Sequence, residues 1–86
     1  MLSTMLSFDV KVVDGEGISV PSIEVGARYR YPTASRTWSA ETTDINGYAR
    51  FRDDHPETPT EVCLFVADQE CGTYALSEGV HITLEM

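Results

Sequence analysis

The stretch TTDINGYARF, residues 42–51, joins two short runs in which apolar and polar residues alternate. Its acidic and amide side chains beside a glycine allow two interpretations, a calcium loop or a tight turn. If Gly47 takes the glycine position of an EF-hand loop, Arg50 falls at a ligand position, where a cation would repel calcium. Asp44 can instead accept hydrogen bonds from backbone N–H groups, and Asn46 and Gly47 tolerate positive φ. The stretch therefore predicts a hairpin turn.

Alternation with a period of two extends over most of the chain. It forms seven short runs, which turn-rich segments such as DGEG, YPTAS and DDHPETP separate. Period two is the geometry of a strand with one buried face, and no run has the cap and apolar face of a helix. We therefore predict an all-β fold, an antiparallel β-sandwich of about seven strands. The aromatic residues expected in its core are Phe8, Trp38, Phe51 and Tyr74.

Size and charge exclude several classes of function. The 86 residues are enough for one domain, residues 1–86, with one thin core. Fourteen acidic residues against six basic ones give a net charge of −8, which disfavours nucleic-acid binding because phosphates attract cations. No apolar run approaches the roughly 20 residues that span a bilayer, and the start of the chain lacks the basic region of a signal peptide. We expect no membrane insertion and, by default, a cytoplasmic location, unless the chain was cut from a longer precursor.

Two blocks of the sequence, about residues 10–25 and 42–51, resemble one family. VVDGEG, VPSIEV and TTDINGYARF are similar to the D-x-x-G, V-P-G-A-x-V and T-D-x-x-G-x-Y/F-x-F blocks of the carboxypeptidase regulatory-like domain, a transthyretin-like (prealbumin-like) β-sandwich. Ser22 and Ile23 replace the family's Gly-Ala, so the family pattern does not predict the backbone conformation after Pro21. The resemblance implies an Ig-like or transthyretin-like Greek key that serves as a folding partner, spacer or binding module. A related enzyme, hydroxyisourate hydrolase, ends in Tyr-Arg-Gly-Ser, whereas this chain ends in HITLEM.

The cysteines and histidines match no established site. The hairpin register expected around DQEC separates Cys63 from Cys71 too far for a disulfide, although a bulge could shift that register. Their spacing to His55 and His81 matches no compact zinc pattern. A Cys63–His81 nucleophile pair is conceivable, but it requires the two side chains within hydrogen-bond reach. We predict two free thiols, no metal site, no cofactor and no catalytic residue.

The arginines suggest a surface for a partner. All five lie between residues 28 and 52, where two acidic residues leave a charge of +3, whereas the rest of the chain carries −11. Alternation turns four of them away from the core: Arg28, Arg30, Arg50 and Arg52. If their strands share one sheet, they form a basic stripe for an acidic partner, which could be the acidic end of another copy. The alternative is that they pair with the nearby Glu24 and Glu41 and contribute little.

The sequence therefore predicts a non-enzymatic interaction or accessory module. It would act on a protein partner or on itself, through a sheet face, an edge strand or its end loops. One alternative is a module that binds a small ligand or carbohydrate through Tyr29, Tyr31 or Trp38; this requires an exposed ring, whereas alternation places all three inward. Another is a small hydrolase with His55 or His81 at an oligomer interface.

Overall fold

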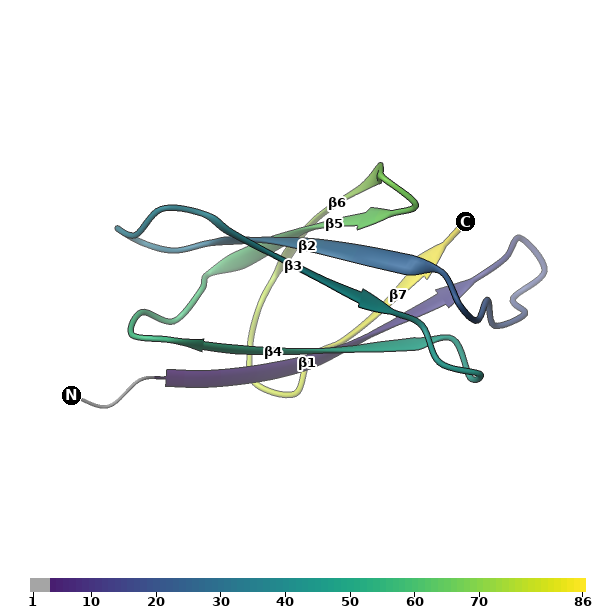
Figure 1. Ribbon diagram of the computed structural model, residues 1–86, viewed down its shortest axis with the longest axis horizontal. Helices are drawn as coiled ribbons and strands as arrows, with labels where there is room; N and C mark the ends of the chain where they lie inside the picture. The colour runs from purple at the N-terminus through teal and green to yellow at the C-terminus, as the bar shows by residue number, and fades with distance from the viewer. Residues whose placement is uncertain (1–3) are drawn as a thin grey trace.

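The computed structural model describes residues 4–86, which form seven strands and no helix (Figure 1). The strands are β1 (Thr4–Val13), β2 (Glu24–Arg30), β3 (Thr37–Thr42), β4 (Tyr48–His55), β5 (Glu61–Val66), β6 (Gln69–Ala75) and β7 (His81–Glu85). Strands β4, β1 and β7 form a three-stranded sheet in that order. Strands β3, β2, β5 and β6 form a four-stranded sheet that packs against it. The predicted all-β sandwich of about seven strands is confirmed.

One strand pair departs from the antiparallel prediction. Strand β1 pairs antiparallel with β4, but it pairs parallel with β7, with Asp9 opposite His81 and Val13 opposite Glu85. The other three pairs are antiparallel. A parallel pair needs a long crossover connection, and here nearly the whole chain lies between the two partners. Alternation could not reveal this, because the side-chain period is the same in both kinds of pair.

The core lies between the sheets and is centred on three rings. Phe8 of β1 stacks on Phe51 of β4 at 5.2 Å between ring centroids, and it meets Tyr29 of β2 edge-on at 6.1 Å. Buried aliphatic side chains surround them: Val10, Val12, Val25, Val62, Leu64, Ile82 and Leu84. Burying each such side chain stabilises the fold by about 1.5–3 kcal/mol. The predicted core positions of Phe8 and Phe51 are confirmed.

The predicted core position of Trp38 is wrong, since its side chain is 60% exposed. Residues directly opposite each other in an antiparallel pair point to the same side of the sheet. Ala27 lies opposite Ser39 and Arg28 lies opposite Trp38. Because Ala27 is in the core, Ser39 points inward and Trp38 points to the outer face. Tyr74 packs against the core but is only partly buried.

The turn predicted for TTDINGYARF is confirmed. The Asp44 carboxylate accepts hydrogen bonds from the backbone N–H groups of Asn46 at 2.9 Å and Tyr48 at 3.0 Å. The Gly47 N–H donates to the Asp44 carbonyl at 2.9 Å, and Gly47 has a φ of 82°. The aspartate therefore organises the reversal of the chain between β3 and β4.

The DGEG segment forms the same turn at the end of β1. The Asp14 carboxylate accepts from the backbone N–H groups two and four residues ahead, at 2.8 and 3.0 Å, and Gly17 also has a φ of 82°. The two glycines differ in their surroundings. A Cβ at Gly47 would lie 2.9 Å from the Val12 carbonyl oxygen, whereas a Cβ at Gly17 would meet nothing within 4 Å. One turn is packed and the other is open.

The VPSI segment is held against the end of β3 by a buried threonine. The Thr43 hydroxyl donates to the Val20 carbonyl at 2.8 Å and accepts from the Ile23 N–H at 3.0 Å. The Ser22 N–H donates to the Thr43 carbonyl at 3.0 Å, and Ser22 has a φ of 58°. Ser22 thus adopts the left-handed conformation that glycine takes most readily, at the position where the resembling family has glycine.

The two turns allow backbone strain to be separated from packing. We expect Gly17→Ala to reduce the free energy of unfolding by about 1–2 kcal/mol, the cost of the left-handed conformation for alanine. We expect Gly47→Ala to cost roughly 1–3 kcal/mol more, because its Cβ also meets the backbone of β1. Urea unfolding of both variants measures the difference. Equal losses would show that the turn at Gly47 relaxes without cost.

Candidate functional site

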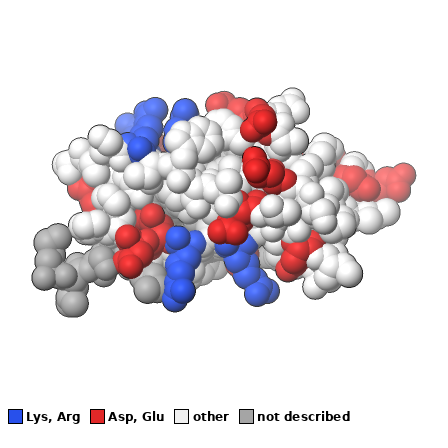
Figure 2. Space-filling model, in the orientation of Figure 1, with Lys and Arg blue, Asp and Glu red and all other residues white. Residues whose placement is uncertain are grey.

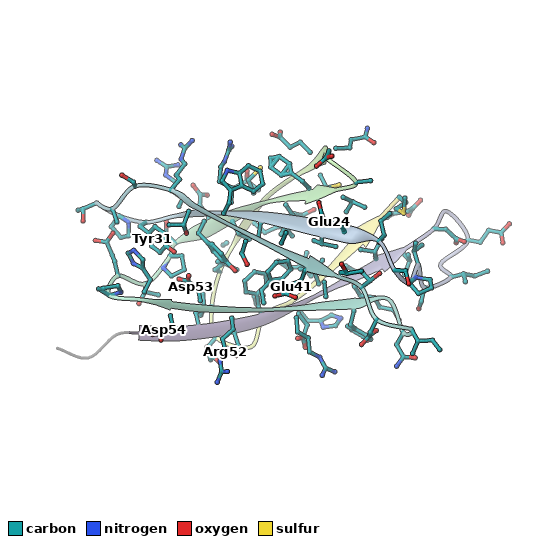
Figure 3. All side chains as sticks on the ribbon, in the orientation of Figure 1. Glu24, Tyr31, Glu41, Arg52, Asp53 and Asp54 are labelled. Atoms are coloured by element: carbon teal, nitrogen blue, oxygen red, sulfur yellow. The ribbon has the colours of Figure 1, made fainter. Side chains whose placement is uncertain are left out.

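The four arginines of the predicted basic stripe lie on two different sheets. Arg28 and Arg30 belong to β2 of the four-stranded sheet, whereas Arg50 and Arg52 belong to β4 of the three-stranded sheet. Outward side chains of the two packed sheets point to opposite sides of the molecule. Figure 2 shows the cationic side chains in separate groups along the upper and lower margins, and Arg52 points away from the sandwich in Figure 3. The condition for a single basic stripe, that these strands share one sheet, is therefore not met.

The outer face of the four-stranded sheet carries a pair of aromatic rings. Trp38 of β3 and Phe65 of β5 lie 5.0 Å apart between ring centroids. Between their strands runs β2, where Gly26 lies directly opposite Phe65. A Cβ on Gly26 would stand 3.3 Å from the indole and 3.6 Å from Phe65 Cβ. The missing side chain leaves the room in which the two rings meet across the central strand.

Arg28 connects this aromatic pair to a basic group. Its guanidinium carbon lies 5.9 Å from the Trp38 ring centroid and 5.7 Å from that of Phe65, within the range of cation–π attraction. A small depression beside it is lined by Arg28, Arg30, Arg36, Glu61, Cys63 and Thr73. Glu61 pairs with Arg30 at 2.7 Å, so this depression holds three cations and one anion. We call Trp38, Phe65, Arg28, Arg30 and Arg36 the aromatic–arginine surface.

The opposite side of the aromatic pair is acidic. A depression of about 320 Å³ is lined by Glu24, Gly26, Trp38, Ala40, Phe65 and Asp68. Its floor is apolar, and its charged groups are the two carboxylates. Trp38 therefore stands between a basic and an acidic part of the same sheet face.

The outer face of the three-stranded sheet pairs its charges locally. Arg50 lies 3.8 Å from the Asp9 carboxylate, and the Lys11 ammonium lies 5.3 Å from the Tyr48 ring centroid. His81 packs against the same tyrosine ring at 5.5 Å. These exposed pairs contribute little stability each.

A polar cluster fills the space between the sheets near the ends of β2 and β4. The Tyr31 hydroxyl lies 2.9 Å from the Thr37 hydroxyl and 3.1 Å from both carboxylate oxygens of Asp53, which it faces in Figure 3. His55 stacks on the Tyr31 ring at 4.0 Å, and its Nδ1 accepts from the Glu57 N–H at 3.0 Å. Burial raises the pKa of Tyr31 above its ordinary value. The cluster is a structural contact between the sheets.

Cys63 and His81 do not form the conceivable nucleophile pair. Cys63 lies on the outer side of β5, beside the arginines, whereas His81 lies on the outer side of β7. The two packed sheets separate them by about 10 Å or more. Cys63 and Cys71 are free thiols, and a bulge in β6 makes Cys71 the extra residue between the partners of Leu64 and Phe65.

Within residues 4–86, no group of three or more His, Cys, Asp or Glu side chains is placed to hold a metal ion. The same residues contain no helix long and apolar enough to cross a membrane.

Comparison of the chain with protein-family models, with curated proteins and with solved structures gave no match in any of the three. The resemblance to the carboxypeptidase regulatory-like domain therefore stays a prediction based on its turn-forming blocks.

The sequence did not predict two members of the aromatic–arginine surface, Phe65 and Arg36, as site residues. Phe65 alternates with Val62, Leu64 and Val66 on β5, so the sequence predicts that it lies on the other face of the strand. The sequence does not predict its contact with Trp38. Arg36 precedes β3 and carries no periodic signal. Its place beside Arg28 and Arg30 depends on the pairing of β2 with β3.

Glu57 fastens the loop that carries Arg36. Its carboxylate accepts from the backbone N–H groups of Thr33 at 2.9 Å and Ala34 at 2.8 Å, and from the Thr33 hydroxyl. The hydrogen bond from the Thr33 hydroxyl, followed by those from the two N–H groups, holds the pKa of Glu57 below its ordinary value. A carboxyl whose folded pKa is depressed contributes stability above its unfolded pKa, and this stability is lost as the pH falls through the folded pKa.

Replacing Glu57 with glutamine should therefore have a pH-dependent effect. We expect Glu57→Gln to lower the melting temperature at pH 7, and the difference from the wild type to shrink as the pH falls below about 4.3, the unfolded value for glutamate. Thermal unfolding between pH 7 and pH 3 measures it. Glu16→Gln, in an exposed turn, serves as the matched control. A difference that stays constant over this range would contradict the assigned role of the carboxylate.

Proposed function

We propose that this chain is a non-enzymatic binding module that recognises an acidic protein segment with its aromatic–arginine surface. The observation that carries the proposal is Trp38, a large apolar side chain that is 60% exposed and packed beside Phe65 and Arg28. Tryptophan and arginine are the residues that most often dominate the binding energy of protein interfaces. Exposed apolar groups rimmed by polar ones are typical of interaction sites.

The charges of this surface favour an acidic partner. The chain carries −8 overall, yet Arg28, Arg30 and Arg36 gather on one face with Glu61 as the anion among them. The planar guanidinium can hold a carboxylate with two parallel hydrogen bonds. An acidic segment would place its carboxylates beside the arginines and an apolar side chain on the adjacent indole. Binding would also remove the two rings from water, which adds a hydrophobic contribution.

Two observations support a binding module rather than an enzyme. Cys63 and His81 lie on opposite faces, and the Tyr31 hydroxyl is occupied by Thr37 and Asp53. The turn-forming blocks resemble those of a family whose members serve as accessory or binding domains. This family argument is an analogy of fold and carries less weight than the surface itself.

A second candidate is the binding of a small neutral ligand such as a carbohydrate. This alternative requires an exposed aromatic ring, and Trp38 meets the requirement although alternation predicted it inward, whereas Tyr29 and Tyr31 are buried. The acidic depression favours such a ligand, because the hydroxyl groups of a sugar stacked on the indole could donate to Glu24 and Asp68. This ligand would use the acidic side of Trp38 rather than the arginines.

The intrinsic fluorescence of Trp38 offers a direct test, because it is the only tryptophan of the chain. We expect dodecapeptides selected from a random library on the wild-type protein to be rich in Asp and Glu around one apolar residue. They should change the fluorescence of Trp38 on binding. The double variant Arg28→Glu, Arg36→Glu should bind them at least about tenfold more weakly, which corresponds to 1.4 kcal/mol.

The double variant Arg50→Glu, Arg52→Glu is the matched control, since it makes the same charge change on the opposite sheet. Equal weakening in both variants would mean a nonspecific charge effect and would contradict the proposal. Selection of peptides without acidic residues would also contradict it. Oligosaccharides that change the fluorescence equally in the wild type and in the Arg28→Glu, Arg36→Glu variant would favour the second candidate.

A further inference from the structure

Within residues 4–86 the two sheets differ by one strand, and no strand of this range lies opposite β6. The order β4, β1, β7 packs against the order β3, β2, β5, β6, with β4 beside β3. The three-stranded sheet therefore ends at β7, where the four-stranded sheet continues to β6. In Figure 1, β7 runs toward the hairpin of β5 and β6 at this side of the sandwich. Among the described residues, no strand pairs with the outer edge of β7.

A groove of about 480 Å³ lies beside this edge. Its lining comes from both edges: Val66, Ala67, Gln69, Glu70, Cys71, Tyr74, Thr83, Leu84, Glu85 and Met86. This volume lies within the range of about 300–1,000 Å³ that is typical of ligand sites. The groove is thus large enough for several side chains.

The chemistry of the groove is apolar inside and acidic at its rim. Val66 and Leu84 form part of its floor and belong to the core, and Tyr74 and Cys71 are partly buried beside them. Glu70 and Glu85 are its charged groups, and the ten lining residues include no cation. A ligand with apolar side chains and a positive charge complements this lining.

The backbone of β7 offers hydrogen bonds toward the groove. The Val80 carbonyl and the Met86 N–H bond to β1, at 3.2 and 2.8 Å. In a parallel ladder alternate residues bond to the same neighbour, so the even-numbered residues of β7 face β1. The main-chain groups of His81, Thr83 and Glu85 therefore point to the open edge. Such an edge can pair with an added strand.

We propose that this groove binds an extended peptide segment that adds to β7 as a fourth strand. Alternate apolar side chains of the segment would enter the groove between Leu84 and Tyr74, and a basic side chain would lie beside Glu70 and Glu85. The main chain supplies affinity and the groove supplies specificity, as in other cases of strand addition. The site is separate from the aromatic–arginine surface, and the proposal does not depend on the function proposed above.

The test uses a hexapeptide that alternates lysine and valine, with the glutamate–valine hexapeptide for comparison. On the wild-type protein we expect saturable binding of the lysine–valine peptide alone. Hydrogen exchange followed by NMR should show at least about tenfold slower exchange of the Thr83 and Glu85 amides, because these N–H groups would bond to the added strand. Binding without this protection, or no binding at all, would overturn the proposal.

Two variants make the test specific. Thr83→Pro removes an N–H that points to the open edge and should abolish binding, whereas Thr83→Val keeps the N–H and should preserve it. The double variant Glu70→Lys, Glu85→Lys should reverse the peptide preference, so that the glutamate–valine peptide binds at least about tenfold better than the lysine–valine peptide. These two glutamates are exposed, so this variant remains informative if Thr83→Pro does not fold. An unchanged preference would overturn the proposal.

A second copy of the chain could occupy the groove in place of a peptide, and sedimentation separates these two cases. Sedimentation that shows a dimer of the wild type, lost in Thr83→Pro but kept in Thr83→Val, would assign the groove to a second copy and overturn its assignment to a peptide.

Discussion

The register of β2 against its two neighbours is the constraint on which the surfaces of this protein depend. Ala27 and Tyr29 must point into the core, and residues opposite them in antiparallel pairs must point the same way. Ser39 and Thr37 therefore face inward, and Trp38 is left on the outer face beside Arg28. The same register sets Phe65 opposite Gly26, where the missing side chain lets the two rings meet.

Local hydrogen bonds hold this register at the ends of the strands. The two D-x-x-G turns use one aspartate each to satisfy several backbone N–H groups, and Thr43 ties the VPSI segment to the end of β3. A buried threonine with both its donor and its acceptor function satisfied costs little to bury. The edge strand β3 is thereby fixed at one end by the turn after it and by the segment before β2.

The unequal size of the two sheets shapes the rest of the surface. The four-stranded sheet presents an aromatic and basic face, whereas the shorter sheet leaves an apolar groove with an acidic rim beside β6. Charge is thus segregated by strand order rather than by position in the chain. The arginines cluster in the sequence but are divided between opposite faces, because β2 and β4 belong to different sheets.

The sequence by itself determined the strands, the turns and the inward face of most strands, because these follow from a local period and from side chains such as Asp44 that bond to their own backbone. It also identified Arg28, Arg30, Arg50 and Arg52 as outward. Only the tertiary structure decided which strands share a sheet, that β1 and β7 run parallel, and that Trp38 lies outside. Alternation separates the two faces of a strand, but it does not decide which face of β3 is buried. The apolar face with Trp38 and Ala40 points outward, whereas the polar face with Thr37 and Ser39 points inward. That choice follows from pairing with β2, a contact between residues distant in the chain.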